Sequence, residues 1–409
     1  MKVYINVDHS SVMEHADDKL RTACEQALAE KYGESIPDQI RARYESELGH
    51  IVSDGFSPYY ILASMLAAKS RELGYLHNLR GSAGGSFIVY LLGISEVNPL
   101  PPHTCCPRCR RVEFVDAEEY SSGFDMNRCD GERKTCPACG GPLAGDGHNI
   151  PVEFFAGFYG DRAPDFIFNF APELQEDMFR YLEGVFGKEN ICLGDPPADG
   201  FCHVSGTVKL DILSHSMFSK LKRMEESAGI SAGSIKFEDI DIFSFFMDDD
   251  FKGLPFDGEL VRSIAGTVFP ARFSDVVKIL GFAHGRNVWT NNGETLAGTV
   301  CYPENVIAHR DDVMLTLLRH GIDRKTAFDI AEMVRKGEAE SYLAGEREAM
   351  LIEHGVPEWY TKSMKKIKYL FPKAHSTEYA INTLRMIWYK IHTPEAFFAA
   401  VADVDGRLL

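Results

Sequence analysis

The segment at residues 163–170, A-P-D-F-I-F-N-F, places a carboxylate where an extended chain could hold half of a metal site. Successive side chains of a strand point to opposite faces, so the three phenylalanines share one apolar face and Asp165 shares the other with Ile167. A second carboxylate sharing the same ion would stand two residues after the first, and that position is Ile167. For the segment alone, a buried edge strand with one capped aspartate is the alternative.

Two C-x-x-C pairs form the strongest local motif in the chain. The four cysteines are Cys106, Cys109, Cys136 and Cys139. The short gap within each pair lets both sulfurs reach one ion, and four thiolates fill the tetrahedral shell of zinc. Because no coordination position is left open, we expect a structural zinc that stabilises a ribbon with little core of its own. Cysteines without a ligand are the alternative.

A glycine-rich turn precedes an apolar run. Residues 80–86 read R-G-S-A-G-G-S, a composition in which backbone N–H groups and hydroxyls can bind phosphate. The spacing matches neither a Walker loop nor a dinucleotide-binding fingerprint. A tight turn without a ligand is therefore the alternative for these residues.

The composition is that of a globular chain with core enough for two or three domains: 409 residues, 45% hydrophobic and 25% charged. We find no run of about 18 apolar residues and no charged-then-apolar leader, and expect a protein that neither spans a membrane nor is secreted. Paired and scattered cysteines fit a reducing cytoplasm better than a disulfide framework. The formal net charge of -17 disfavours general adhesion to nucleic acid and leaves a local basic channel open.

Hydrophobic periodicity predicts the elements that carry these residues. Apolar residues recur at three- and four-residue steps from about residue 17 to 74, which indicates helices. A helix is expected over about residues 173–186 and a turn at 195–200. The segment 208–213, V-K-L-D-I-L, reads as a second strand in which Asp211 alternates with leucine and isoleucine. From about residue 216 onward the pattern is largely helical.

Taken in order, the motifs resemble the palm of the Gram-positive (PolC-type) DNA polymerase III alpha subunit. The matching segments are the two cysteine pairs and residues 80–87, 93–103, 150–158, 160–165 and 208–215. Residues 281–289, 309–314, 334–337 and 365–375 are similar to the fingers of the same family. The resemblance runs from about residue 20 to 400 in the family's own order.

The resemblance implies an α+β fold. A palm-like sheet domain would cover residues 1–214, with a four-cysteine zinc ribbon inserted at about 103–142, and a mainly α-helical fingers-like domain would cover residues 215–409. The family's chemistry is phosphoryl transfer with two Mg²⁺ ions held by clustered carboxylates. Asp165 matches the first of these carboxylates and Asp211 the third. The second falls on Ile167, so we expect Mg²⁺ binding to be weakened.

The resemblance also implies a set of nucleotide-binding residues. In the glycine-rich loop they are Arg80, Ser82 and Ser86. In the fingers they are Arg335, Lys336, Lys366, Lys368, Lys373 and His375. For each of them, a solvated or capping residue retained by folding alone is the alternative.

The sequence departs from the family pattern in what it lacks. Between Asp165 and Asp211 the family carries its thumb and a further palm strand, whereas here the interval holds one helix and a turn. The exonuclease and phosphoesterase-like (PHP) domains and the C-terminal DNA-binding and clamp-binding modules are also missing from this sequence. Because the family's thumb grips the primer-template, duplex binding is expected to suffer.

Three functions are compatible with these features. The favoured one is a truncated polymerase relative, cytoplasmic and not membrane-bound, that binds nucleotide, DNA or a replisome protein and does not extend primers unaided. The second is an active DNA-directed DNA polymerase in which Asp161 or Glu153 replaces the missing ligand, or a partner supplies the thumb. The third is a zinc-stapled scaffold for protein interactions with no nucleic-acid role.

Overall fold

The computed structural model describes residues 1–8, 10–116, 119–127, 135–194, 206–239, 241–247, 251–255 and 258–406. The turn predicted at 195–200 lies outside these residues. Within them the chain forms one sheet of five strands and one of three, together with helices that make up most of its second half. None of the helices in the described part combines the length and the apolarity needed to cross a bilayer.

A mixed sheet forms the centre of the first half of the chain. Its strands lie in the order β2 (Asn78–Leu79), β6 (Phe166–Phe170), β8 (Thr207–Ser214), β1 (Lys2–Asn6) and β7 (Ile191–Leu193). Strands β6 and β8 pair in parallel, and the other described pairs of this sheet are antiparallel. Parallel neighbours need a crossover, and α6 (Gln175–Phe186) lies between them in sequence. Both predicted strands are thus confirmed, whereas β1 was not expected.

The apolar face of this sheet fixes the orientation of β6. Phe166, Phe168 and Phe170 are at most 1% exposed, as strand alternation requires. Tyr60 of α3 (Ser57–Glu72) meets the Phe166 ring edge-on, with 5.3 Å between the ring centroids. Each buried aromatic ring removes roughly 150–250 Å² from water. The phenylalanines therefore hold one face of β6 in the core and leave Ile167 on the other.

Three helices occupy the region predicted to be helical between residues 17 and 74. They are α1 (Ala16–Tyr32), α2 (Asp38–Ser53) and α3. Buried residues at four-residue spacing place one face of α1 in the core. These residues are Leu20, Cys24, Leu28 and Tyr32. The glycine-rich turn that follows is a 3-10 turn at Ala83–Gly85 and leads into the short helix α4 (Phe87–Leu91).

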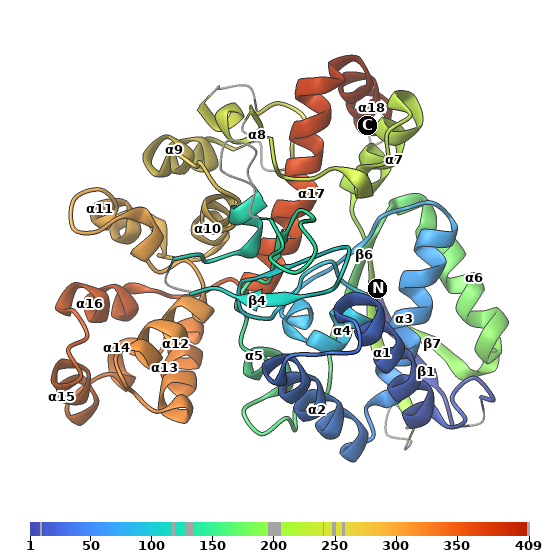
Figure 1. The fold of residues 1–409 in the computed structure, drawn as a ribbon, viewed down its shortest axis with the longest axis horizontal. Coiled ribbons are helices and arrows are strands. Elements are labelled where there is room, and N and C mark those ends of the chain that lie inside the picture. Colours follow the sequence, from blue (N-terminus) through green and yellow to red (C-terminus); the bar gives the residue numbers. More distant parts are fainter. Residues whose placement is uncertain are drawn as a thin grey trace.

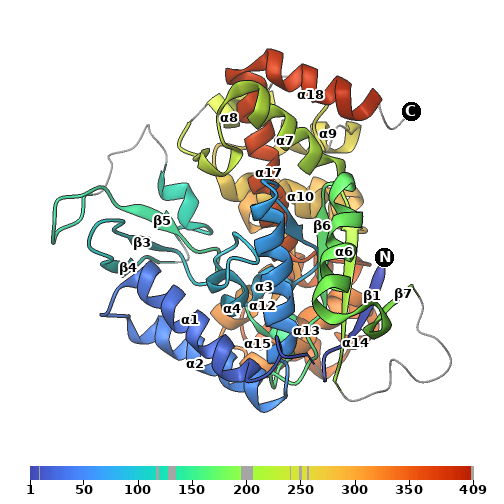
Figure 2. The same cartoon turned by 90° about the vertical axis from the view of Figure 1, so that its right-hand side faces the viewer.

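A small three-stranded sheet carries the cysteine pairs. Its strands are β3 (His103–Cys105), β4 (Val112–Phe114) and β5 (Ala144–Asp146), in the order β4-β3-β5. Figure 2 shows this ribbon projecting away from the five-stranded sheet. At its base a 3-10 turn, Gly123–Asn127, packs Phe124 against Phe273 with 5.0 Å between the ring centroids. The ribbon is therefore attached to the helical half of the chain as well as to the sheet.

The second half of the chain is helical, as predicted, and confirms an α+β fold with a helical second part. Its helices are α7 (Ser216–Ala228), α8 (Asp241–Ser244), α9 (Glu259–Val268), α10 (Phe273–His284), α11 (Glu294–Leu296), α12 (Arg310–Arg319), α13 (Arg324–Lys336), α14 (Ala339–Tyr342), α15 (Glu346–Glu353), α16 (Glu358–Lys366), α17 (Lys373–His392) and α18 (Pro394–Gly406). The helix α5 (Glu153–Ala156) precedes them in the chain and leads into β6.

Helix α17 joins the two halves. Figure 1 shows it passing from the sheet to the helices α7 and α18. Glu378 Oε2 accepts a hydrogen bond from the Leu79 backbone N–H at 3.0 Å, so α17 packs on β2. Arg385 donates to both carboxylate oxygens of Glu96 at 2.6 and 2.7 Å. The C-terminal part of the chain thus contributes to the core of the first half and places the start of α17 beside the glycine-rich turn.

Candidate active site and metal centre

Four side chains form a square on the face of β6 and β8 opposite the phenylalanines. The parallel register pairs Ile167 with Asp211. By the same register Asp165, the residue before β6, falls beside Lys209. Neighbouring residues of paired strands present their side chains on the same face. The sheet therefore brings the two carboxylates to diagonal corners, and it places Ile167 and Lys209 at the other two.

Lys209 bridges the two carboxylates. Its Nζ lies 3.0 Å from Asp165 Oδ1 and 3.5 Å from Asp211 Oδ2. The Asp165 side chain is 58% exposed and that of Asp211 is 15% exposed. Asp165 is therefore open to solvent, whereas Asp211 is largely covered. Burial would lower the pKa of Lys209, but its hydrogen bonds and charge attraction to Asp165 and Asp211 raise it. Lys209 therefore stays a cation between two anions.

Arg80 lies next to this square. Its backbone N–H donates to the Ile167 carbonyl at 2.8 Å, which continues the pairing of β2 with β6 by one residue. The next backbone N–H, that of Gly81, donates to His375 Nδ1 at 3.4 Å. Burial, and then the charge of Arg80, lower the pKa of His375 to about 3, so this ring is neutral. The fold thus brings together Arg80 and His375, two predicted nucleotide-binding residues that lie far apart in the sequence.

The two serines of the loop differ in what they contact. Ser86 is buried, and its hydroxyl donates to Glu47 Oε2 at 2.8 Å and accepts from the Val89 N–H at the start of α4. This hydroxyl is therefore occupied within the fold as a helix cap. Ser82 is partly exposed, and its carbonyl accepts from the Gly85 N–H at 2.9 Å in the 3-10 turn.

The basic residues predicted in the fingers differ in their contacts. Lys373 is 9% exposed, and its Nζ approaches the Ser121 carbonyl at 3.5 Å, toward the base of the ribbon. Lys366 Nζ donates to the Asn291 carbonyl at 3.0 Å. Arg335 forms a bidentate pair with Glu332 at 3.0 and 2.8 Å. The remaining two are exposed: Lys336 ends α13, and Lys368 Nζ lies 3.9 Å from Glu340.

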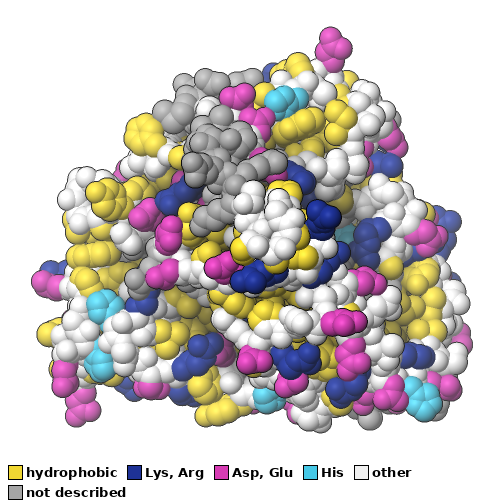
Figure 3. Space-filling view, viewed as in Figure 1, with side chains coloured by type: hydrophobic (Ala, Val, Ile, Leu, Met, Phe, Trp, Pro, Cys, Tyr) yellow, Lys and Arg dark blue, Asp and Glu magenta, His cyan; other side chains and the backbone are white. Residues whose placement is uncertain are grey.

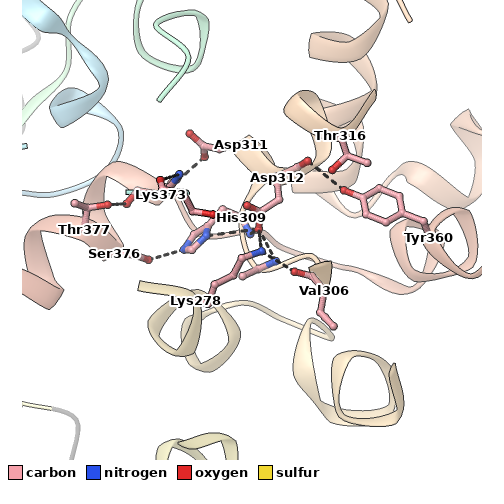
Figure 4. Close-up of polar contacts among 12 residues, drawn as sticks. Lys278, Val306, His309, Asp311, Asp312, Thr316, Tyr360, Lys373, Ser376 and Thr377 are labelled. Carbon is pink, nitrogen blue, oxygen red and sulfur yellow. Dashed lines mark hydrogen bonds and ion pairs between the residues drawn. The ribbon is translucent and has the colours of Figure 1, made fainter. Parts of the chain in front are cut away.

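Sequence reasoning missed a polar network that ties four helices together. Lys278 Nζ of α10 lies 2.9 Å from Asp312 Oδ2 of α12, and Tyr360 OH of α16 donates to the Asp312 carbonyl at 3.1 Å. His309 Nε2 lies 2.8 Å from Ser376 Oγ of α17 (Figure 4). The sequence signal for this network was the H-R-D-D segment at 309–312. An acidic residue at the third position of a helix commonly accepts hydrogen bonds from the backbone N–H groups at the start of that helix.

Asp312 is the centre of this network. Its Oδ2 also accepts from the backbone N–H groups of Ala308 and His309 at 2.9 and 3.0 Å. Burial would raise the pKa of Asp312, but Lys278 and His309 hold it well below its usual range. A cavity of about 680 Å³ lies beside the network, between the base of the ribbon and helices α10, α12 and α16. The network fixes how these helices pack around the start of α17.

The two carboxylates proposed as replacements for the missing ligand have other surroundings. Glu153 of α5 forms an ion pair with Arg324 of α13. Asp161 is exposed in the loop that precedes β6. Among the described residues, no hydrogen bond or ion pair joins either of them to Asp165, Lys209 or Asp211.

The four predicted cysteines converge at the tip of the ribbon. Their sulfur atoms all lie within 4.8 Å of one another, with Cys106 and Cys139 3.5 Å apart and Cys109 and Cys136 3.4 Å apart. The two knuckles have the same backbone bonds, because the Arg110 and Gly140 N–H groups donate to the carbonyls of the first cysteines at 2.8 Å. Sulfurs about 2.3 Å from a tetrahedral ion require spacings of this size. The cluster can therefore hold a metal ion.

Backbone hydrogen bonds lower the pKa of one of these thiols. The backbone N–H of Cys109 is the main cause that lowers the pKa of Cys106, to about 6. The thiolate is the form that binds metal.

On the face in Figure 3, basic and acidic side chains are interspersed rather than gathered into one basic surface.

Family comparisons agree with this arrangement of a sheet followed by helices. Residues 18–193 match the model of the bacterial DNA polymerase III alpha NTPase domain. Residues 209–354 match the model of the bacterial DNA polymerase III alpha subunit finger domain. The two matches follow one another in the same order as the sheet and the helices.

Curated relatives extend the match over nearly the whole chain. The DNA polymerase III PolC-type of Thermotoga maritima is 31% identical over 493 positions, which cover 97% of this chain and 36% of the relative. That of Caldanaerobacter subterraneus subsp. tengcongensis is 32% identical over 96% of this chain and 34% of its own length. That of Bacillus subtilis is 31% identical over 96% of this chain and 33% of its own length.

The chain spans about a third of the length of these relatives. The 493 aligned positions also exceed its own 409 residues, so the Thermotoga maritima relative carries residues inside the aligned span that this chain lacks. Two consecutive domain models match this chain, and the relatives are 31–32% identical to it over at least 96% of its sequence. The chain belongs to the PolC-type DNA polymerase III family.

Proposed function

We propose that this chain is a polymerase-derived protein that binds nucleotide or DNA and does not extend primers unaided. The observation that carries the proposal is the pairing of Ile167 with Asp211 across β6 and β8. Two-metal phosphoryl transfer needs ligands that hold both ions against the substrate. Mg²⁺ takes oxygen ligands in near-ideal octahedral geometry, and an isoleucine side chain has no atom that can coordinate it. The side chains of this face therefore do not fit a site for two Mg²⁺ ions.

The glycine-rich loop supports the binding part of the proposal. Arg80 is exposed and has no ion pair among the described residues, so its guanidinium is available to a ligand. Arginine binds phosphate through two parallel hydrogen bonds and keeps its charge at any physiological pH. The neutral ring of His375 holds the neighbouring Gly81 N–H in place. We propose a phosphate group of a nucleotide or of DNA as the ligand of Arg80, in a cytoplasmic protein.

We also propose that the ion of the cysteine cluster is zinc and that its role is structural. Four thiolates leave no position for water or substrate, which catalytic zinc requires. The three strands of the ribbon have three residues each, and such short strands need an additional constraint to stay folded.

Primer extension tests the loss of catalysis. The purified chain is incubated with a primed template, deoxynucleotides and Mg²⁺, and an active PolC-type enzyme serves as the positive control. We expect no extension by the wild-type chain. Extension that disappears in both Asp165→Asn and Asp211→Asn would contradict the proposal and restore the hypothesis of an active polymerase.

Binding is measured separately from catalysis. Fluorescence anisotropy with a labelled nucleotide and with labelled single-stranded DNA should give saturable binding that weakens with salt, because each phosphate contact releases counterions. Absence of binding to both probes would favour a scaffold for protein interactions. Extension only after addition of a second replication protein would show that a partner supplies the missing parts.

A further inference from the structure

The cavity beside the Asp312 network is separate from the sheet face that carries Asp165 and Asp211. Its volume of about 680 Å³ lies within the range of pockets for small molecules, roughly 300–1,000 Å³. Neither of these two aspartates nor Arg80 is among the described residues that line it. Its walls come from the base of the ribbon, from α10, α12 and α16, and from the start of α17. The cavity is therefore a site of its own, with the size for a small molecule.

Helix α17 directs Lys373 to this cavity and His375 to the glycine-rich loop. Two positions along a helix differ by about 200° around its axis, so the two side chains lie on opposite sides. His375 contacts the Gly81 N–H, whereas Lys373 lines the cavity and approaches the Ser121 carbonyl. The resemblance groups both residues as nucleotide-binding, but the fold places Lys373 beside the cavity and away from the loop.

Lys373 is a buried cation without a carboxylate partner. It is 9% exposed, and it forms no ion pair within the described part of the chain. Its ammonium has three donors, and its contact with the Ser121 carbonyl, at 3.5 Å, is longer than the usual range of about 2.7–3.2 Å. Asp311 accepts from the Lys373 backbone N–H at 3.2 Å, and Asp312 pairs with Lys278 (Figure 4). Burial is the main cause that lowers the pKa of Lys373. Because a buried charge is normally paired, this ammonium is available to a ligand.

The other charged side chains of the cavity leave few groups to compete for this ammonium. Arg272 is paired with Glu304 at 2.8 Å. Glu119 is exposed, and solvent and salt screen its charge. Arg319 of α12 has no carboxylate partner among the described residues, and its described hydrogen bonds stay within its own helix. Lys373 and Arg319 can therefore serve an anion without the loss of an existing ion pair.

The wall that α16 contributes is aromatic. Trp359 and Tyr360 both line the cavity, with 5.5 Å between their ring centroids. The Tyr360 hydroxyl is held by the Asp312 carbonyl, whereas Trp359 is partly exposed. Leu315 and Leu318 of α12 add apolar surface. Apolar and aromatic walls with a few polar groups are typical of sites for small molecules.

We propose that this cavity binds a small molecule that carries an oxyanion on an aromatic or apolar body, with Lys373 as the partner of the oxyanion. Phosphate and carboxylate groups share this chemistry, because both accept charge-assisted hydrogen bonds from an ammonium. Such bonds are short, about 2.7–2.9 Å, and take the place of one long contact. The site goes beyond the proposed function, because it lies apart from Arg80 and from the carboxylates of the sheet.

Calorimetry and ligand-observed NMR test the proposal with three small probes. Phenyl phosphate and benzoate present the two oxyanions on an aromatic ring, and benzamide is the neutral analogue of benzoate. The full chain and four variants are titrated with each probe. Lys373→Met removes the ammonium, and Leu315→Trp fills the cavity but keeps the ammonium. Lys188→Met is the control for an exposed lysine outside the cavity, and Arg80→Gln is the control for the loop.

The proposal requires a specific pattern of binding. Phenyl phosphate, benzoate or both should bind the wild-type chain saturably, and benzamide should bind at least about tenfold more weakly because it forms no charge-assisted bond. Lys373→Met and Leu315→Trp should each weaken binding of the anion by at least about tenfold, and the two controls should leave it unchanged. Equal binding of the anion by wild type and Lys373→Met, binding of benzamide as tight as that of the anion, or no saturable binding of either anion would overturn the proposal.

Folding and the proposed function are kept apart from this test. Circular dichroism and thermal unfolding establish that each variant is folded. If Lys373→Met does not fold, Leu315→Trp decides, and unchanged anion binding by the folded tryptophan variant overturns the proposal. Failure of the proposed function would appear as absent binding of labelled nucleotide and DNA, whereas failure of this proposal would leave that binding intact.

Discussion

Ile167 lies directly opposite Asp211 in the parallel pairing of β6 with β8. A β-branched residue suits this position in a strand, because its side chain packs well against neighbours on a pleated surface. Ile167, at the position where the resemblance implies a carboxylate, is therefore favourable for the pairing of β6 with β8. Phe166, Phe168 and Phe170, at most 1% exposed, hold the other face of β6 in the core.

Removal of the Arg80 side-chain charge should weaken nucleotide binding without affecting the fold. Arg80 is exposed and its side chain has no ion pair in the described part of the chain, so Arg80→Gln is expected to change stability by less than about 0.5 kcal/mol. Loss of a hydrogen bond to a charged group costs about 1.5–3 kcal/mol, or roughly a tenfold or larger rise in Kd. Fluorescence anisotropy with a labelled nucleotide measures this change in Kd. Arg41→Gln, an exposed arginine of α2, is the control, and an equal loss there would contradict the assignment.

Removal of the metal should loosen the ribbon and leave the five-stranded sheet intact. We expect one zinc per chain by elemental analysis and its loss in Cys109→Ser, because three thiolates leave the tetrahedral shell incomplete. Hydrogen exchange should then increase at residues 103–114 and 135–146 and stay unchanged in β6 and β8. Cys192→Ser in β7 is the control outside the cluster. Unchanged exchange in the ribbon after loss of zinc would refute the structural role.

Glu378 should make the protein less stable as the pH rises. Burial is the main cause that raises the pKa of this carboxyl to about 8 from its ordinary value near 4.5. Between these two values the folded chain binds a proton that the unfolded chain has lost, so the stability falls with rising pH. Glu378→Gln keeps an acceptor for the Leu79 N–H and removes the titration.

Urea unfolding at about pH 5 and about pH 8 measures this effect. The glutamine variant should match wild type near the lower pH and exceed it near the higher one, with a flatter dependence between them. Glu346→Gln, an exposed residue of α15, should leave the wild-type slope unchanged. A steeper slope in Glu378→Gln would refute the assignment.

Breaking the Lys278–Asp312 pair should destabilise the helical half. Lys278→Met leaves the Asp312 carboxylate largely buried without its cation, which costs about 3 kcal/mol or more for pairs of this kind. Asp312→Asn in the same chain removes the uncompensated charge and should recover part of the loss. Chemical unfolding of the single and double variants gives the coupling energy. Strictly additive effects would show that the two residues do not interact energetically.

The sequence was sufficient for features that depend on local spacing. The two C-x-x-C pairs predicted a metal cluster because a two-residue gap constrains both sulfurs locally, and their sulfur atoms do converge. Alternating phenylalanines predicted the buried face of β6, and helical periodicity predicted α1 to α3 and the helical second half. The order of the motifs was enough to indicate the family, and the family comparisons confirm it.

The tertiary structure alone decided which side chains meet. Lys209 was part of the second predicted strand, but only the parallel register of β6 with β8 places its ammonium between Asp165 and Asp211. Burial directs the Ser86 hydroxyl to Glu47, and the packing of α17 turns Lys373 toward the ribbon. Register and helix packing follow from contacts between distant segments, and these contacts leave no periodic signal in the sequence. The sequence by itself put an isoleucine at position 167, where the resemblance implies a carboxylate, and the fold determined that Lys209 stands beside Asp165 and Asp211.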